Sequence, residues 1–143
     1  MEIIFIAESP IGLGETIFIP VVPHISFIDC ETKDEEFTNI KGQSLNIIGG
    51  KGLRTFSFTS FFPSKKYNFV NWAKFRPPIT YVKFFEKYRD LQVPVRVIVI
   101  DRYIVVLNML CRYNFSYALR DKAGDIPYTL EVKEYIKPRK SVF

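Results

Sequence analysis

The feature that most constrains the fold is a succession of short runs rich in β-branched and aromatic residues, each closed by glycine, proline or charged residues. The clearest alternation lies between residues 53 and 62, where Phe56 and Phe58 alternate with polar residues at the period of two expected of a half-buried strand. Comparable runs predict further strands at 1–7, 16–22, 43–48, 95–100, 103–113 and 128–135. The chain is therefore predicted to be β-rich.

Turn residues predict how some of these strands connect. Asp101-Arg102 joins two of them into a hairpin, and residues 115–119 are expected to extend its second strand. Pro20 cannot donate a ladder hydrogen bond, so the strand at 16–22 is expected to end at a sheet edge. The charged stretch 31–36 is predicted to be either a solvent-facing hairpin or a loop that becomes ordered only when it binds a partner.

One segment has a helical period instead. Tyr81, Val82, Phe85 and Tyr88 share a helical face, and proline is well tolerated at a first helical position. We therefore expect one amphipathic helix at about 78–91, in an α+β fold that is a β-rich small barrel or sandwich. The predicted core comprises Phe56, Phe58, Val82, Phe85, Val97, Val99, Leu130 and Val132.

The length favours one domain. A chain of 143 residues, 48% of them hydrophobic, can bury one sizeable core, and no repeat or linker divides it. The apolar stretch at 3–7 is too short for an export signal, and no run approaches the ~20 apolar residues that span a bilayer. We expect a single β-rich domain over 1–143 that starts in a cytoplasm and makes no membrane contact.

The charge of +5 fits two kinds of protein. A polyanionic partner would suit it, but charges of this size also keep small domains soluble, and acidic residues are interspersed with the basic ones. Only the end of the chain, with Lys137, Arg139 and Lys140, is purely basic. Solubility is the favoured interpretation.

Residues that could carry chemistry are few. His24 is the only histidine, Cys30 and Cys111 match no disulfide or metal pattern, and both are expected to be reduced thiols. The glycine-rich run at 49–52 lacks the spacing and the following helix of a phosphate-binding loop. Asp34 and Glu36 have no apolar surroundings that would raise a carboxyl pKa. We expect no enzyme activity, no catalytic residue, no metal and no cofactor.

Contact surfaces are better candidates for function. In the segment 65–76, basic residues alternate with aromatic ones, a composition that suits core or edge cover, a protein interface or the stacking of single-stranded nucleic acid. The first two readings are favoured over the third. The candidate assembly contacts are Lys33, Asp34, Glu35, Glu36, Lys65, Lys66, Tyr67, Phe69 and Trp72.

Several segments together resemble a known family. They read NIIG and GLRT at 46–55, SFTSFFP at 57–63, PVRVIV at 94–99 and GDIPYTLEVKEY at 124–135, with the helical segment between them. This order is similar to that of the N-terminal domain of the LysM-containing tail and baseplate proteins of Gram-positive myophages, defective prophages and phage-tail bacteriocins. With the N-terminal strand and residues 19–21, the likeness covers nearly the full chain.

The resemblance implies a role and not an active site. It implies a structural component of a contractile phage-like tail, an inner-baseplate adaptor that joins tail tube and hub in several symmetric copies. Its partners would be the tail tube, the baseplate hub and neighbouring baseplate proteins. Its location would be the tail particle, assembled in the bacterial host cytoplasm. The family commonly continues into a LysM module, which is absent from residues 1–143, and this puts peptidoglycan contact in doubt.

The alternative is a basic β module that binds single-stranded nucleic acid through residues 65–76 and the basic tail.

Overall fold

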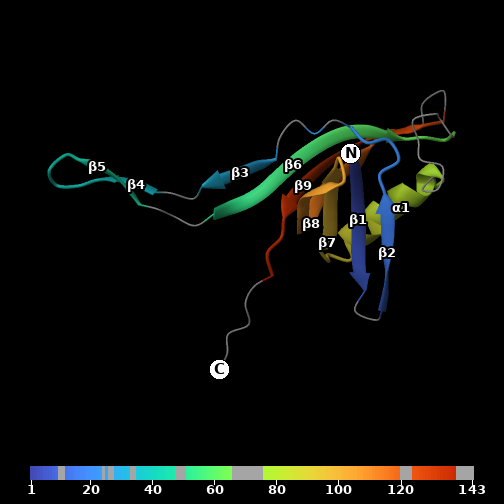
Figure 1. The fold of residues 1–143 in the computed structure, drawn as a ribbon, viewed down its shortest axis with the longest axis horizontal. Helices are drawn as coiled ribbons and strands as arrows, with labels where there is room; N and C mark the ends of the chain where they lie inside the picture. The colour runs from blue at the N-terminus through green and yellow to red at the C-terminus, as the bar shows by residue number, and fades with distance from the viewer. Residues whose placement is uncertain are drawn as a thin grey trace.

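The described residues fold into a seven-stranded antiparallel sheet with one helix packed on it and a separate two-stranded hairpin, in the computed structural model of Figure 1. The structure describes residues 1–9, 12–23, 25, 28–32, 35–47, 51–65, 76–119 and 124–137. The α+β class, the β-rich character and the one helix are confirmed. The elements are β1 (Glu2–Ser9), β2 (Gly12–Phe18), β3 (Asp29–Thr32), β4 (Glu35–Thr38), β5 (Ser44–Ile47), β6 (Lys51–Phe62), α1 (Pro78–Asp90), β7 (Val95–Asp101), β8 (Ile104–Tyr117) and β9 (Ile126–Glu134).

The main sheet has seven strands in the order β2-β1-β7-β8-β9-β6-β3, all antiparallel. Strand β8 belongs to both halves of it, because its residues 104–111 pair with β7 and its residues 111–117 pair with β9. The sheet ends at β2 and β3. Strands β4 and β5 form a separate hairpin.

One face of the sheet is buried. Strand alternation places every second residue of the central strands on that face, and the helix covers it. All eight predicted core residues are buried, as are neighbours such as Phe5, Phe62 and Tyr128. The expected core is confirmed.

Aromatic rings join the helix to the sheet. The ring centroid of Phe85 lies 5.2 Å from that of Phe5, 5.3 Å from that of Tyr113 and 5.1 Å from that of Phe115. Phe62 stacks on Tyr128 at 4.0 Å. The Tyr113 hydroxyl donates a 2.7 Å hydrogen bond to the Phe85 carbonyl. Because strands β1, β6, β8 and β9 all contribute to one ring cluster, they hold α1 in a defined place.

The helix matches its prediction closely. It runs from Pro78 to Asp90, with proline at its first position, and Leu91 is its C-cap. Its buried residues are Tyr81, Val82, Phe84, Phe85 and Tyr88. Lys87 and Arg89 stand in the last turn, where cations oppose the partial negative charge of the helix end.

Strand ends differ from the sequence prediction, most clearly at β2 and β8, and the turn predicted at Asp101-Arg102 is made instead by Arg102 and Tyr103. The predicted strand at 16–22 begins earlier, as β2, and ends at Phe18, after which Ile19 donates a last hydrogen bond to Ile3. It is an edge strand, as Pro20 predicted. Val22, Ile25 and Ile28 then pack against the core on the way to β3, and the Ser60 hydroxyl donates to the Val21 carbonyl at 2.8 Å. Strand β8 ends at Tyr117, so the extension expected at 115–119 stops two residues early.

Candidate functional site

The predicted contact residues fall in two separate places. Lys33, Asp34, Lys66, Tyr67, Phe69 and Trp72 lie outside the described residues. Glu35 and Glu36 belong to β4, where Glu36 is exposed and pairs with Asn46, and exposed Lys65 follows the far end of β6. The structure therefore does not bring the described members of the set together.

The hairpin of β4 and β5 forms a projecting arm. It extends away from the main sheet in Figure 1, and among the described elements neither strand packs extensively against any other. The charged stretch 31–36 is thus divided between β3 and β4, and its second part belongs to a hairpin in solvent. We call residues 35–47 the arm.

The arm ends in a well-bonded turn, which the sequence analysis did not identify. The Asn39 side-chain carbonyl accepts hydrogen bonds from the backbone N–H groups of Lys41 and Gln43 at 3.0 and 2.9 Å. Gly42 has a φ of +80°, a conformation that favours glycine. Ile40, at the tip, has a relative exposure of 106%. Asn at the first position and Gly at the fourth are the signals for such a turn, so a defined backbone presents a fully exposed isoleucine.

A second apolar surface lies at the turn between β7 and β8. Arg102 and Tyr103 have φ values of +50° and +66°, the left-handed conformation of a primed hairpin turn. Tyr103 is 102% exposed, and Ile104, Val105 and Val106 are 68%, 57% and 53% exposed. We call residues 103–106 the hairpin end. The sequence predicted this hairpin but gave no sign that its apolar residues remain uncovered.

Cys30 in β3 and Cys111 in β8, the two thiols expected to be reduced, lie outside the arm and the hairpin end. Burial raises the pKa of the Cys111 thiol to about 12, so it stays protonated at neutral pH. Cys30 is free and its thiol lies 3.5 Å from the Gly52 carbonyl. His24 lies outside the described residues. No cluster of three metal-ligating side chains occurs in the part of the chain that the structure describes.

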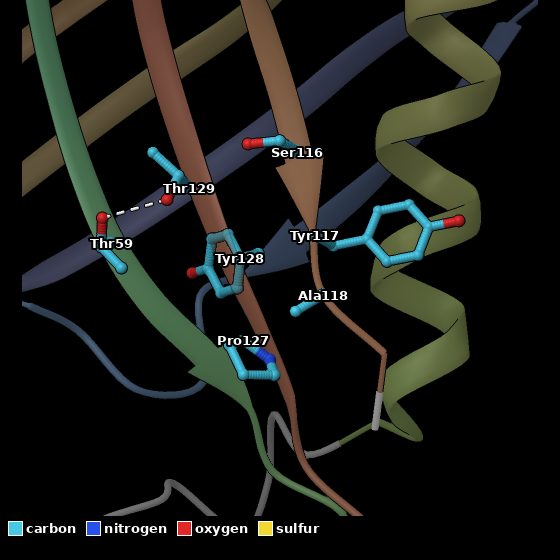
Figure 2. A pocket seen from close by; sticks show the side chains of 7 residues that line it. All are labelled: Thr59, Ser116, Tyr117, Ala118, Pro127, Tyr128 and Thr129. Carbon is cyan, nitrogen blue, oxygen red and sulfur yellow. Dashed lines mark hydrogen bonds between the residues drawn. The ribbon is translucent and has the colours of Figure 1, made fainter. Parts of the chain in front are cut away.

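A shallow hollow of about 280 Å³ lies where β6 and β8 end beside the start of β9. Figure 2 shows its lining, in which the hydroxyls of Thr59 and Thr129 are hydrogen bonded at 3.1 Å and the Tyr117 ring points away from them toward α1. The lining residues are Thr59, Ser116, Tyr117, Ala118, Pro127, Tyr128 and Thr129. Since they include hydroxyls but no carboxylate, amine or imidazole, this set provides no acid–base pair.

Asp125 is a buried carboxylate that the sequence analysis missed. It is 6% exposed and accepts hydrogen bonds from the Ser64 backbone N–H at 2.8 Å and the Ser64 hydroxyl at 3.0 Å. Ser64 follows β6 and Asp125 precedes β9, so the carboxylate ties the ends of these paired strands together. Its surroundings indicate a structural role.

Comparison with known proteins adds a distant likeness. No family model matches the sequence. The uncharacterized protein YqbP of Bacillus subtilis strain 168 is 29% identical over 126 residues, an alignment that covers 85% of this chain and 56% of that protein. The chain therefore spans little more than half the length of that curated relative. No described helix is long and apolar enough to cross a membrane.

Proposed function

We propose that this chain is a non-catalytic structural component of a contractile phage-like tail. In this proposal it is an inner-baseplate adaptor that joins the tail tube to the hub and is present in several symmetric copies. The particle is a phage, a defective prophage or a phage-tail bacteriocin, assembled in the host cytoplasm. The sequence resemblance described above, which spans nearly the whole chain, gives the proposal its specific content.

The observation that carries the proposal is the projecting arm. A two-stranded hairpin is marginally stable by itself in water and normally needs a third strand or a packed face. The arm receives little support from the described body of its own chain. A part of this kind fits a subunit whose structure is completed by its neighbours in an assembly.

The predicted contacts fit this proposal in part. Glu35 and Glu36 are on the arm, at positions where a neighbour would meet them. Lys65 lies beyond the other end of β6, so it would serve a different neighbour. An adaptor that joins tube to hub requires two such surfaces, because each partner occupies its own side of the ring.

Co-purification tests the proposal. The tagged chain, expressed with the tail-tube and hub proteins of the same gene cluster, is expected to bring down at least one of them. A variant in which residues 35–47 are replaced by a short glycine-serine linker should lose that partner while keeping its fold. Recovery of the chain alone, with neither tube nor hub protein, would contradict the proposal.

Nucleic acid binding provides the opposing test. Oligonucleotide titrations at two salt concentrations are expected to show no tight complex. Phosphate contacts weaken steeply with salt, so strong binding at low salt that disappears at high salt would favour the nucleic-acid alternative. Lys65→Glu should leave such a titration unchanged if the chain is an adaptor.

A further inference from the structure

Strand β8 gives the main sheet a free edge in addition to those of its two outer strands. It pairs with β7 from Ile104 to Cys111, whereas its pairing with β9 begins only at Cys111. On the β9 side, the hydrogen bond from the Tyr135 N–H to the Leu110 carbonyl is the last one in the described chain. Within the described residues, the β9 side of 104–109 is therefore a sheet edge, which we call the open edge.

The backbone of the open edge is placed for pairing. In an antiparallel ladder, every second residue turns both its N–H and its carbonyl toward the same neighbouring strand. Leu110 faces the β9 side, so exposed Asn108 faces it as well. The register with β7 is regular from Leu107 to Leu110, because its one shift lies between Leu107 and Val105. A strand added along this side would find the N–H and the carbonyl of Asn108 in position for hydrogen bonds.

The open edge lacks the protection that the outer strands have. Exposed edges are normally blunted by short length, charged residues or proline. Strand β3 has four residues, two of them acidic, and β2 contains Glu15 and is followed by Pro20. Positions 104–109 have the sequence IVVLNM, without charge or proline, and Ile104, Val105 and Val106 are each more than half exposed. An edge of this composition is suited to pairing with a further strand.

The sequence that follows β9 is not suited to fill the open edge. Cys111 pairs with Glu134, so a longer β9 in the same register would place position 137 opposite Asn108. Strand β9 ends at Glu134, and positions 137–140 read Lys-Pro-Arg-Lys. Proline and lysine are the residues that natural proteins use to stop strand pairing. The open edge is therefore left to a strand that β9 does not supply.

Basic side chains gather at one end of the open edge. Arg112 of β8 lies directly opposite Lys133 of β9, and like charges in such a pair destabilise a sheet. On β7, the Arg96 guanidinium donates a 2.9 Å hydrogen bond to the Asn108 side-chain carbonyl. This end of the edge therefore favours a partner with negative charge.

Nearby carboxylates do not balance these cations. Glu134 accepts its hydrogen bonds from Arg54 on β6, and Glu131 lies beyond the Arg112–Lys133 pair as seen from the open edge. At the other end of the edge, Asp101 is followed in the sequence by Arg102, so the two charges offset each other. The charge of the open edge is thus unequal along its length, basic at one end and balanced at the other.

The turn at the balanced end is kept at a conformational cost. Arg102 and Tyr103 have positive φ in a turn that strongly prefers Asn-Gly. Strained backbone of this kind is concentrated at functional sites. The Tyr103 ring is fully exposed, and tyrosine is a frequent anchor of protein interfaces. The turn therefore places an aromatic contact beside the open edge.

We infer that the open edge binds an extended segment of a partner protein, which adds a strand beside β8. The segment has β-branched or other apolar residues along 104–109 and acidic residues at the end that meets Arg112 and Lys133. Backbone hydrogen bonds supply its affinity and the charges fix which end lies where. The inference does not depend on the arm or on the tail, since any partner with such a segment would serve.

Selection from a random peptide library displayed on yeast cells, with the full chain as the bait, tests this inference. The enriched peptides should alternate β-branched residues and carry Asp or Glu near one end, and they should bind less tightly as salt rises. Asn108→Pro removes the N–H of the open edge and should weaken binding by about tenfold, as expected for one hydrogen bond. Asn108→Ser is the matched control, because it loses the same side chain but keeps the N–H.

Hydrogen exchange of the wild-type complex provides a second readout that does not require the proline variant to fold. The bound peptide should slow exchange of the Asn108 amide and leave the amides of β2 and β3 unchanged. Enrichment of basic peptides, no enrichment at all, or equal binding to the proline and serine variants would overturn the inference. Slower Asn108 exchange caused by an oligonucleotide, or by a higher concentration of the chain alone, would also overturn it, in favour of nucleic acid or a second copy.

Discussion

The Glu134 carboxylate accepts two hydrogen bonds from Arg54, one from its backbone N–H at 3.1 Å and one from its guanidinium at 2.9 Å. Glu134 is the last residue of β9, and Arg54 stands where β6 continues past the end of β9. The Glu134 side chain thus accepts the hydrogen bond of the Arg54 backbone N–H at the position where backbone pairing between β6 and β9 stops. It also raises the pKa of Arg54 through its hydrogen bond.

Glu134→Ala should destabilise the fold. The two side chains are 29% and 11% exposed, so the substitution leaves a half-buried guanidinium and a backbone donor without their acceptor. Such losses cost about 1–3 kcal/mol. Urea unfolding measures the change, with exposed Glu131→Ala on the same strand as the control. Equal midpoints for both variants would show that the contact does not stabilise the sheet end.

Tyr113→Phe should cost about 1 kcal/mol, the usual net worth of a neutral hydrogen bond. The lost bond is the 2.7 Å contact of the Tyr113 hydroxyl with the Phe85 carbonyl, which joins β8 to α1. Tyr103→Phe removes a hydroxyl that is fully exposed, so its unfolding midpoint should not change. A similar effect of both substitutions in urea would contradict this account of the core.

Stability should fall as pH rises above about 9. Burial raises the pKa of Cys111 from 9.0 to about 12, and burial likewise raises the pKa values of Tyr113 and Tyr128. The folded state then holds protons that the unfolded state releases, so this stabilisation is complete below pH 9 and is lost toward pH 12.

Thermal unfolding at pH 7, 9 and 10.5 measures this effect. Cys111→Ala removes one of the buried acids, and its midpoint should therefore decline less steeply with pH than that of the wild type. Identical slopes would show that Cys111 does not contribute to the alkaline loss.

Replacing Arg102 with Asn and Tyr103 with Gly should raise the free energy of unfolding. Both positions have positive φ, and Asn-Gly is the preferred pair for this turn, so a gain of about 1–2 kcal/mol is expected. Unchanged stability would remove the argument from strain.

The sequence predicted the elements whose periodicity is strong. Phe56 and Phe58 on β6, and the helical face of Val82 and Phe85, are buried as expected because alternation and helical spacing fix which side meets the core. Pro20 likewise marked the edge strand β2 correctly.

Other features depended on contacts that no local pattern shows. The segment with Glu35 and Glu36 was predicted to be either a loop or a hairpin, because charge alone does not distinguish these two structures. The pairing of β4 with β5 shows that it is a hairpin. The strand predicted at 103–113 gave no sign that Ile104, Val105 and Val106 would be exposed, because their exposure depends on where β9 stops. Among the described contact candidates, Glu35 and Glu36 lie on the arm, which precedes β6, whereas Lys65 follows the end of β6, and the predicted strand alone could not reveal this separation.

Ile40 is expected to matter for assembly and not for folding. Ile40→Asp should change the free energy of unfolding by no more than about 0.5 kcal/mol, whereas Phe62→Ala in the core should cost about 3–5 kcal/mol. The first residue is fully exposed and the second is completely buried. Urea unfolding of both variants provides the comparison, and a large cost for Ile40→Asp would mean that the tip packs within its own chain.

Electron cryomicroscopy of the tail particle tests the central claim, that this chain acts through contacts with other protein subunits. The account predicts several symmetric copies at the baseplate end of the tail tube, each with residues 35–47 against a neighbouring subunit. Intact tails that contain no copy of this chain, in cells where it is abundant, would contradict it.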